Sequence, residues 1–254
     1  MDIVAMVLLI TGVHPLVKAL RANRGTTLRQ PLLWSLLAWS AWIGVAWSRV
    51  SRPGVEERMA AYAALCLSGC AGIAVLGARR PGVSAWNFVV VGLLAVLFLP
   101  ILNGMGEPRL EAAQEWFLAV TLMVPLLNYL PTRLASGALL TAAGCGWEMV
   151  RLMGWMSPAR MPWLGLLVLA AAPWASWAGM ASRGSTATAF DRLWLAYRDR
   201  FGFVWGQRMR EQFNRAAHHA GWPVVLRWRG LQPMADQPLP DPAQLLAMLR
   251  AVLK

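Results

Sequence analysis

Apolar residues along the first 180 positions form long runs that are separated by short polar or charged stretches. A helix needs about 20 mostly apolar residues to cross a bilayer, and roughly 17 to 25 are tolerated. Seven runs approach this length, so the sequence predicts an all-α polytopic membrane protein with a transmembrane bundle over residues 1–183. The predicted spans are residues 3–20, 32–48, 59–78, 86–102, 116–130, 134–153 and 162–180.

The fifth and seventh runs are interrupted by prolines, Pro125 and Pro173. Proline is tolerated inside a span where neighbouring helices or water satisfy the freed carbonyl. The first run reaches the required length only if Lys18 extends its ammonium group to the interface. Residues 131–133 alone separate the fifth and sixth runs, which predicts a tight antiparallel pair of helices.

Composition supports a membrane location. Hydrophobic residues make up 57% of the chain and charged residues 14%, against roughly 25% charged in soluble domains. The 24 Lys and Arg residues outnumber the 12 Asp and Glu residues, and such an excess usually indicates contact with phosphate. The 15 Trp residues beside apolar runs are typical of a bilayer interface, so we expect a lipid bilayer and no nucleic acid as the phosphate partner.

The distribution of basic residues predicts the orientation. With the N-terminus outside, the short cytoplasmic loops hold seven Lys and Arg residues. The exterior loops and the adjoining helix ends hold six: Arg49, Arg52, Arg58, Arg109, Arg151 and Arg160. Residues after Met180 add 11 basic residues against five acidic ones. Because cytoplasmic segments carry the excess of Lys and Arg, we predict a multi-pass protein of the cytoplasmic membrane with its N-terminus outside and its C-terminus in the cytoplasm.

Residues 184–254 are predicted to form a basic, amphipathic cytoplasmic tail. Thr188 and Asp191 have the spacing of a capping box, and the apolar residues that follow recur with helical spacing, opposite a face rich in arginine. Gly221 is suited to the left-handed conformation that caps the C-terminus of a helix, and Trp222-Pro223 ends the helix. The pattern predicts one helix of about 30 residues, about 45 Å long.

A short extended segment and a terminal helix are predicted after the long helix. Residues 224–229 alternate apolar and basic side chains like a strand. A lone strand needs a partner edge, which we expect from another copy or another protein if the segment pairs at all. A proline-rich linker then precedes a short helix that begins at Asp241-Pro242. No second globular core is predicted.

Four polar residues inside the predicted spans are candidates for an intramembrane site: Glu148, Arg151, His14 and Asn128. Ionisable groups in spans are rare and often functional. Glu148 and Arg151 are three residues apart on one helix face, so they either pair with each other or line a polar cavity. His14 has no second intramembrane histidine with which to hold a haem.

The tail offers a candidate interface for a partner or for lipid. Its aromatic and arginine-rich positions are Trp194, Arg198, Phe201, Trp205, Arg208, Arg210, Phe213 and Trp228. Three interpretations remain open: packing against the protein's own bundle, docking of a partner, and contact with anionic headgroups. The acidic residues Asp191, Asp199 and Glu211 among the arginines favour docking over a purely basic lipid anchor.

No motif for catalysis, metal binding or cofactor binding is present in the sequence. Cys66 and Cys70 share a helix face, but two soft ligands do not make a metal site. We therefore expect a non-enzymatic accessory or assembly subunit of a membrane complex, which binds a protein partner or a second copy through its tail. The alternative is a carrier for a small or lipid-like substrate that uses Glu148 in a membrane cavity; an intramembrane lipid enzyme would need Glu148, Asn128 and His14 to converge.

Overall fold

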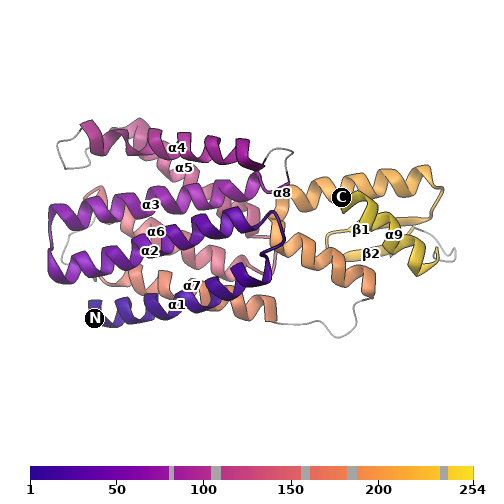
Figure 1. The fold of residues 1–254 in the computed structure, drawn as a ribbon, viewed down its shortest axis with the longest axis horizontal. Helices are drawn as coiled ribbons and strands as arrows, with labels where there is room; N and C mark the ends of the chain where they lie inside the picture. Colours follow the sequence, from indigo (N-terminus) through magenta and orange to yellow (C-terminus); the bar gives the residue numbers. More distant parts are fainter. Residues whose placement is uncertain (80–82, 104–109, 156–160, 182–187, 235–239, 254) are drawn as a thin grey trace. The chain divides into compact units, whose positions relative to one another are not determined.

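The chain forms two compact units, Met1–Gly179 and Met180–Lys254. The computed structural model describes residues 1–79, 83–103, 110–155, 161–181, 188–234 and 240–253. The helices that make up the first unit are α1 (Asp2–Ala22), α2 (Arg29–Ser51), α3 (Val55–Leu76), α4 (Val83–Asn103), α5 (Ala112–Tyr129), α6 (Ala135–Leu152) and α7 (Leu164–Ala181) (Figure 1).

Each predicted span coincides with one of these helices to within four residues at either end. Four of the helices are long and apolar enough to cross a membrane: α1, α3, α4 and α7. The other three fall short of this measure; their polar residues include the serines of α2, Gln114 and Glu115 in α5, and Glu148 in α6. The all-α class and the membrane-type helices are therefore present, whereas length and composition do not confirm a count of seven spans.

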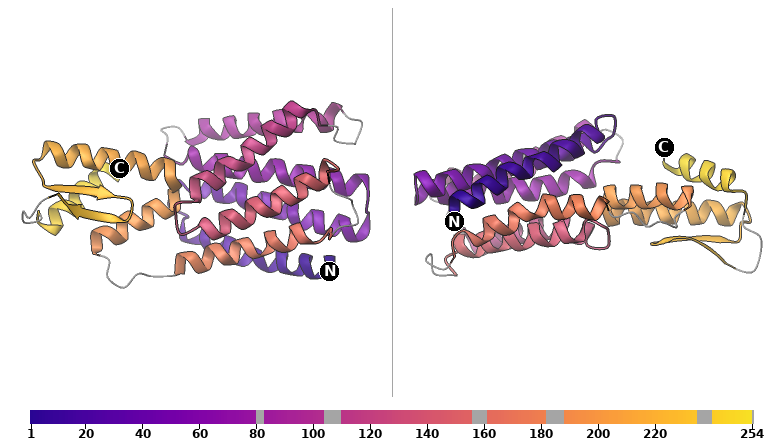
Figure 2. Two further views of the ribbon diagram at one scale, coloured as in Figure 1. Left: turned by 180° about the vertical axis from the view of Figure 1, so that it is seen from behind. Right: turned by 90° about the horizontal axis from the view of Figure 1, so that it is seen from below.

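Helix α3 is the centre of the bundle and packs against α2, α4, α5 and α6. Its contact with α5 depends on small residues, because a Cβ added at Gly69 would lie 2.7 Å from Thr121 and one at Gly72 would lie 2.5 Å from Pro125. On the α2 side, the Trp42 indole donates to Ser68 Oγ at 2.9 Å. In Figures 1 and 2, α4 and α5 lie at one edge of the bundle and α1 and α7 at the opposite edge.

The long helix of the second unit, α8 (Ala189–His219), is bent back on itself at Gly202, and this corrects the prediction of one continuous helix. Gly202 has φ 80° and ψ −166°, a conformation that is essentially restricted to glycine. The rings of Phe190 and Phe213 meet at 5.2 Å, although they would be about 35 Å apart along a straight helix. The N-terminal cap is as predicted, since Thr188 Oγ1 accepts from the Asp191 N–H at 3.1 Å.

The extended segment pairs with a strand of the same chain, which corrects the expectation of an external partner edge. β1 (Val224–Arg227) and β2 (Gly230–Pro233) form an antiparallel hairpin with Trp228 and Arg229 in the turn. The side-chain amide of Asn214 on α8 bonds both backbone groups of Leu226, at 2.7 and 3.2 Å. Sequence reasoning missed β2 because it has only four residues, beginning with Gly230 and ending with Pro233.

The hairpin and the terminal helix α9 (Pro242–Leu253) pack against α8 and cover its aromatic face. The second unit therefore has a core of its own, contrary to the prediction of a tail without one. The buried side chains of this core are Phe190, Trp194, Tyr197, Phe201, Trp205, Met209, Phe213, Ala217, Val224, Leu226, Leu245 and Leu249.

Replacing Gly202 with alanine should destabilise the second unit by about 1–3 kcal/mol, because the bend needs a backbone conformation that an L side chain avoids. Limited proteolysis of the purified full-length protein should show faster cleavage between residues 189 and 253. Gly92→Ala is the matched control, since a Cβ there meets nothing within 4 Å. Equal protease resistance of the two variants would contradict the role given to Gly202.

Candidate functional site

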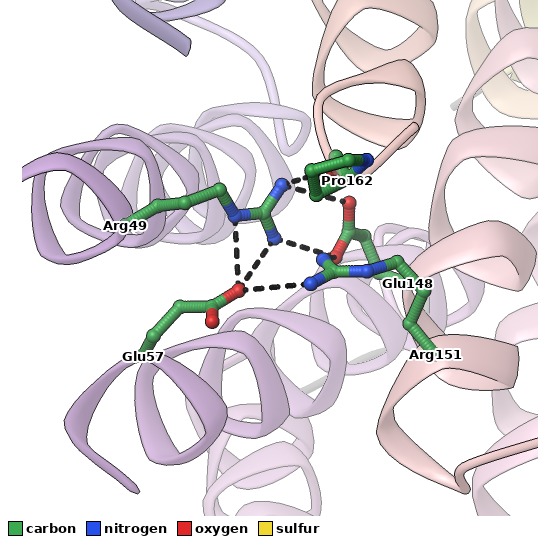
Figure 3. Close-up of polar contacts among 5 residues, drawn as sticks. All are labelled: Arg49, Glu57, Glu148, Arg151 and Pro162. Atoms are coloured by element: carbon green, nitrogen blue, oxygen red, sulfur yellow. Dashed lines mark hydrogen bonds and ion pairs between the residues drawn. The ribbon is translucent and has the colours of Figure 1, made fainter. Parts of the chain in front are cut away.

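Four charged side chains from three helices meet at one end of the first unit (Figure 3). Arg49 comes from the last turn of α2, Glu57 from the first turn of α3, and Glu148 and Arg151 from the end of α6. Successive helices of the bundle run in opposite directions, so the end of α2, the start of α3 and the end of α6 fall at the same level. We call these four residues the charge cluster.

Arg49 is the hub of the charge cluster. Its Nη2 lies 2.8 Å from Glu57 Oε1 and 2.9 Å from Glu148 Oε2, and its Nε donates to Glu57 Oε1 at 2.9 Å. Its Nη1 donates to the carbonyl of Pro162, at the entry to α7. One guanidinium therefore ties α2 to α3, to α6 and to the segment that begins α7.

Arg151 closes the network from the other side. Its Nη1 donates to Glu148 Oε2 at 2.9 Å, and its Nη2 lies 3.4 Å from Glu57 Oε1. The i,i+3 pair that the sequence suggested is thus present, but it is half of a larger network. Each carboxylate is shared by both arginines, and the cluster has no net charge.

The four side chains of the charge cluster are largely shielded from solvent, so their charges must be paired with one another. The exposed fraction of the side chain is 1% for Glu148, 6% for Arg49, 13% for Glu57 and 14% for Arg151. A Cβ added at Gly165 of α7 would lie only 2.4 Å from Glu148 Oε1, so the glycine is what lets α7 close over the carboxylate. An isolated charge at such a position would cost several kcal/mol.

This geometry makes the charge cluster a structural clamp. Both oxygens of Glu148 accept from guanidinium groups, Oε1 at 3.5 Å and Oε2 at 2.9 Å from each arginine, so the carboxylate is engaged by Arg49 and Arg151. In the described part of the chain, no group of three or more His, Cys, Asp or Glu side chains has a metal-binding arrangement. Cys66 and Cys70 are buried, with their sulfur atoms 3.9 Å from carbonyls of α4.

The structure does not bring the four predicted intramembrane residues together. His14 stacks on Trp174 with ring centroids 6.4 Å apart. Asn128 is buried near the end of α5, and Glu148 lies 13 residues into α6 from Ala135, about 20 Å along that helix. Glu148, Asn128 and His14 therefore do not converge on one site, as a lipid enzyme would need.

Sequence reasoning missed Arg49 and Glu57 as partners of Glu148. Arg49 was counted as a loop charge, yet it falls inside the last turn of α2. A usable signal was present, because Arg49 and Glu57 are opposite charges on either side of a short turn and Glu148 and Arg151 end a helix that must return to the same level.

The bundle also contains a cavity of about 230 Å³ between α2, α3, α5, α6 and α7. Glu148 is not among its lining residues. Hydroxyl groups in the lining come from Ser35, Ser68, Tyr129, Thr141 and Ser176. The small residues Ala138 and Ala142 of α6 line this cavity, whereas Gly137 makes the close contact with Ser176 of α7.

Most of the predicted tail interface is interior. Trp194, Phe201, Trp205 and Phe213 are buried. Arg198 is buried as well, with its guanidinium 2.6 Å from Asp199 Oδ1 and 2.8 Å from the Trp228 carbonyl.

Trp228 itself packs edge-on against Trp194 with ring centroids 6.2 Å apart. The aromatic stripe is thus the core of the second unit and not an open surface.

Several arginines lie on the outside of the second unit, along with the exposed apolar residues Phe203 and Val204. Arg208 is exposed and lies over the Trp205 ring at 5.5 Å. A groove of about 510 Å³ runs between α8 and β1. Its lining residues are Arg210, Glu211, Asn214, Arg215, Val225, Leu226 and Arg227. We call this the arginine groove.

Comparisons with protein-family models, with curated proteins and with solved structures return no match for this chain.

Replacing Glu148 with glutamine should lower the free energy of unfolding by about 3–5 kcal/mol, because Arg49 and Arg151 would share the single remaining carboxylate. Arg52→Gln is the control: its pair with Glu56 is exposed, and such pairs contribute about 0–1 kcal/mol. Thermal unfolding in mild detergent distinguishes the two. If Glu148→Gln were no less stable than Arg52→Gln, the clamp would be wrong.

Proposed function

We propose that this protein crosses the cytoplasmic membrane seven times and serves, without catalysis, as an accessory or assembly subunit whose cytoplasmic C-terminal unit docks a protein partner. The observation that carries the proposal is the arginine groove. Because α8 uses its aromatic face within the unit, the groove and its surrounding arginines are what a partner would meet.

Helix dimensions support seven crossings. Helix α2 has 23 residues and α5 and α6 have 18 each, which correspond to about 34 and 27 Å. The hydrocarbon core is about 30 Å thick. The charged residues of α2 and α6 that lie deepest are neutralised in the charge cluster, so their presence does not oppose insertion.

Exposed tryptophans also mark two levels that suit the two interfaces. Trp47, Trp116 and Trp155 lie at the ends of α2, α5 and α6 that share the level of the charge cluster, and all three are exposed. Trp177 is exposed near the end of α7, at the opposite level. Amphipathic indole rings prefer the headgroup region.

The charge cluster also strengthens the predicted orientation. Arg49 and Arg151 were two of the six basic residues assigned to the exterior loops, but both are buried in ion pairs. Removing them leaves four basic residues at the exterior against seven at the cytoplasmic side. Because the orientation rule counts charges near the membrane surface, the N-out, C-in topology gains support.

The composition of the arginine groove favours an acidic protein segment as its occupant. Arg210, Arg215 and Arg227 line it, and its one acidic residue, Glu211, is engaged by Gln207 at 2.5 Å. Apolar contact is available from Val225 and Leu226. Arginine pairs bidentately with carboxylates and is enriched at protein interfaces.

Reversing two groove charges, Arg215→Glu with Arg227→Glu, should weaken docking at least tenfold, about 1.4 kcal/mol. A photocrosslinking residue at Val225 of the full-length protein in native membranes should give one discrete adduct, and the double variant should lose it. Arg250→Glu, an exposed charge on α9 outside the groove, should retain it. Absence of an adduct, or an adduct that survives charge reversal, would contradict docking at the groove.

A carrier is the second candidate, and the 230 Å³ cavity is the observation that favours it. Pro125 of α5 lines the cavity, and an internal proline frees a backbone carbonyl there. A substrate in this cavity would contact hydroxyl groups and apolar side chains and not Glu148, whose bonds to Arg49 and Arg151 hold it in the clamp.

A further inference from the structure

The exposed face of α1 changes from apolar to polar along its length. Val7 and Leu8 are exposed in its first half. Further along the same face, Thr11, His14 and Lys18 are exposed too, since steps of four, three and four residues from Val7 stay on one side of a helix. Lys18 lies four residues before the helix ends at Ala22, which is about 6 Å along the axis.

Helix α7 supplies two indole rings to the same place. Trp174 stacks on His14 with ring centroids 6.4 Å apart, and Trp177 lies under the Lys18 ammonium, 5.2 Å from Nζ to the ring centroid. The two indoles meet edge-on at 6.0 Å. They are 37% and 45% exposed, so the four side chains form a ladder on the outside of the bundle. The two helices that carry them, α1 and α7, lie at the same edge of the bundle (Figures 1 and 2).

This placement is unusual for a membrane bundle. Ionisable side chains within spans normally face the bundle interior or a partner of opposite charge. In the part of the chain that the structure describes, Lys18 makes no ion pair, and its one recorded contact is with the Trp177 ring. The ladder therefore presents an ammonium, an imidazole and two indoles outward, all of which can donate hydrogen bonds.

We propose that the seam between α1 and α7 binds one anionic phospholipid. Its phosphate lies at Lys18 and Trp177, its ester carbonyls lie at the level of His14 and Trp174, and an acyl chain follows the apolar part of α1 along Val7 and Leu8. The two pairs, Lys18 with Trp177 and His14 with Trp174, are separated by four residues of α1, or about 6 Å. This separation matches the thickness of the interfacial layer on each side of the bilayer, about 5–7 Å.

Charge favours an anionic lipid over a zwitterionic one. With the N-terminus outside, Lys18 lies at the cytoplasmic end of α1, where anionic lipids create a negative surface potential. Arg21 is in the last turn of the same helix and adds to the positive field. Basic sites between membrane helices on this side are suited to anionic headgroups. The lipid site requires the membrane topology but not a protein partner at the arginine groove.

The test is lipid binding by the purified full-length protein in detergent, followed by native mass spectrometry. Phosphatidylglycerol should bind as one retained molecule and phosphatidylcholine should not. Lys18→Gln should weaken phosphatidylglycerol binding about fivefold, the equivalent of about 1 kcal/mol for one lysine at a membrane surface. His14→Leu should weaken it less, and Lys18→Arg should retain it.

Arg52→Gln is the matched control, because Arg52 is an exposed cation at the other end of the bundle. Equal binding of the two lipids, or an equal loss in Lys18→Gln and Arg52→Gln, would overturn the site. So would competition by inorganic phosphate at the same concentration, which would indicate a free-phosphate site. A disulfide-linked dimer formed by Thr11→Cys in membranes would assign the seam to a second copy instead.

Discussion

The bundle depends on one constraint, which is that a buried guanidinium must have carboxylates around it. Arg49 satisfies this with Glu57 and Glu148 within 3 Å, and neither carboxylate is adequately neutralised without Arg151. Because removing any partner leaves an uncompensated charge, these groups must assemble together. The relative positions of α2, α3 and α6, and the entry to α7 at Pro162, follow from that requirement.

The second unit has aromatic side chains to bury instead of charges to pair. A straight 31-residue helix would have displayed a continuous aromatic stripe, and large exposed apolar patches drive association. The bend at Gly202 lets Phe190 and Phe213 meet, and the hairpin and α9 cover what remains. Phe203, Val204 and Met234 remain exposed, but most of the aromatic side chains are buried. The second unit therefore buries most of its aromatic residues in a core, whereas the bundle buries charged groups by pairing them.

The positions of the seven bundle helices could be predicted from the sequence because apolar runs and their polar ends are local features. The contacts between helices could not. Arg49 and Glu148 are 99 residues apart, and the sequence relates them only through the level at which their helices end, which does not by itself define the contact. Small residues such as Ala138 and Ala142 are compatible with either close helix packing or a cavity, and here they line the cavity. The bend in α8 could not be predicted from Gly202, since one glycine inside a helical pattern is compatible with a straight helix at a cost of about 1 kcal/mol.

The charge cluster changes how basic residues should be counted when orientation is inferred. The positive-inside rule works through charges that reach the membrane surface. An arginine whose side chain is buried in an ion pair should therefore be left out of the count. Arg49 and Arg151 seemed to weigh against the chosen topology only while they were treated as loop residues. Lys18 is the converse case: it sits within a helix, yet it is exposed near the helix end and contributes fully. Under the proposed topology, discounting these two arginines leaves four basic residues in the exterior loops against seven in the cytoplasmic loops.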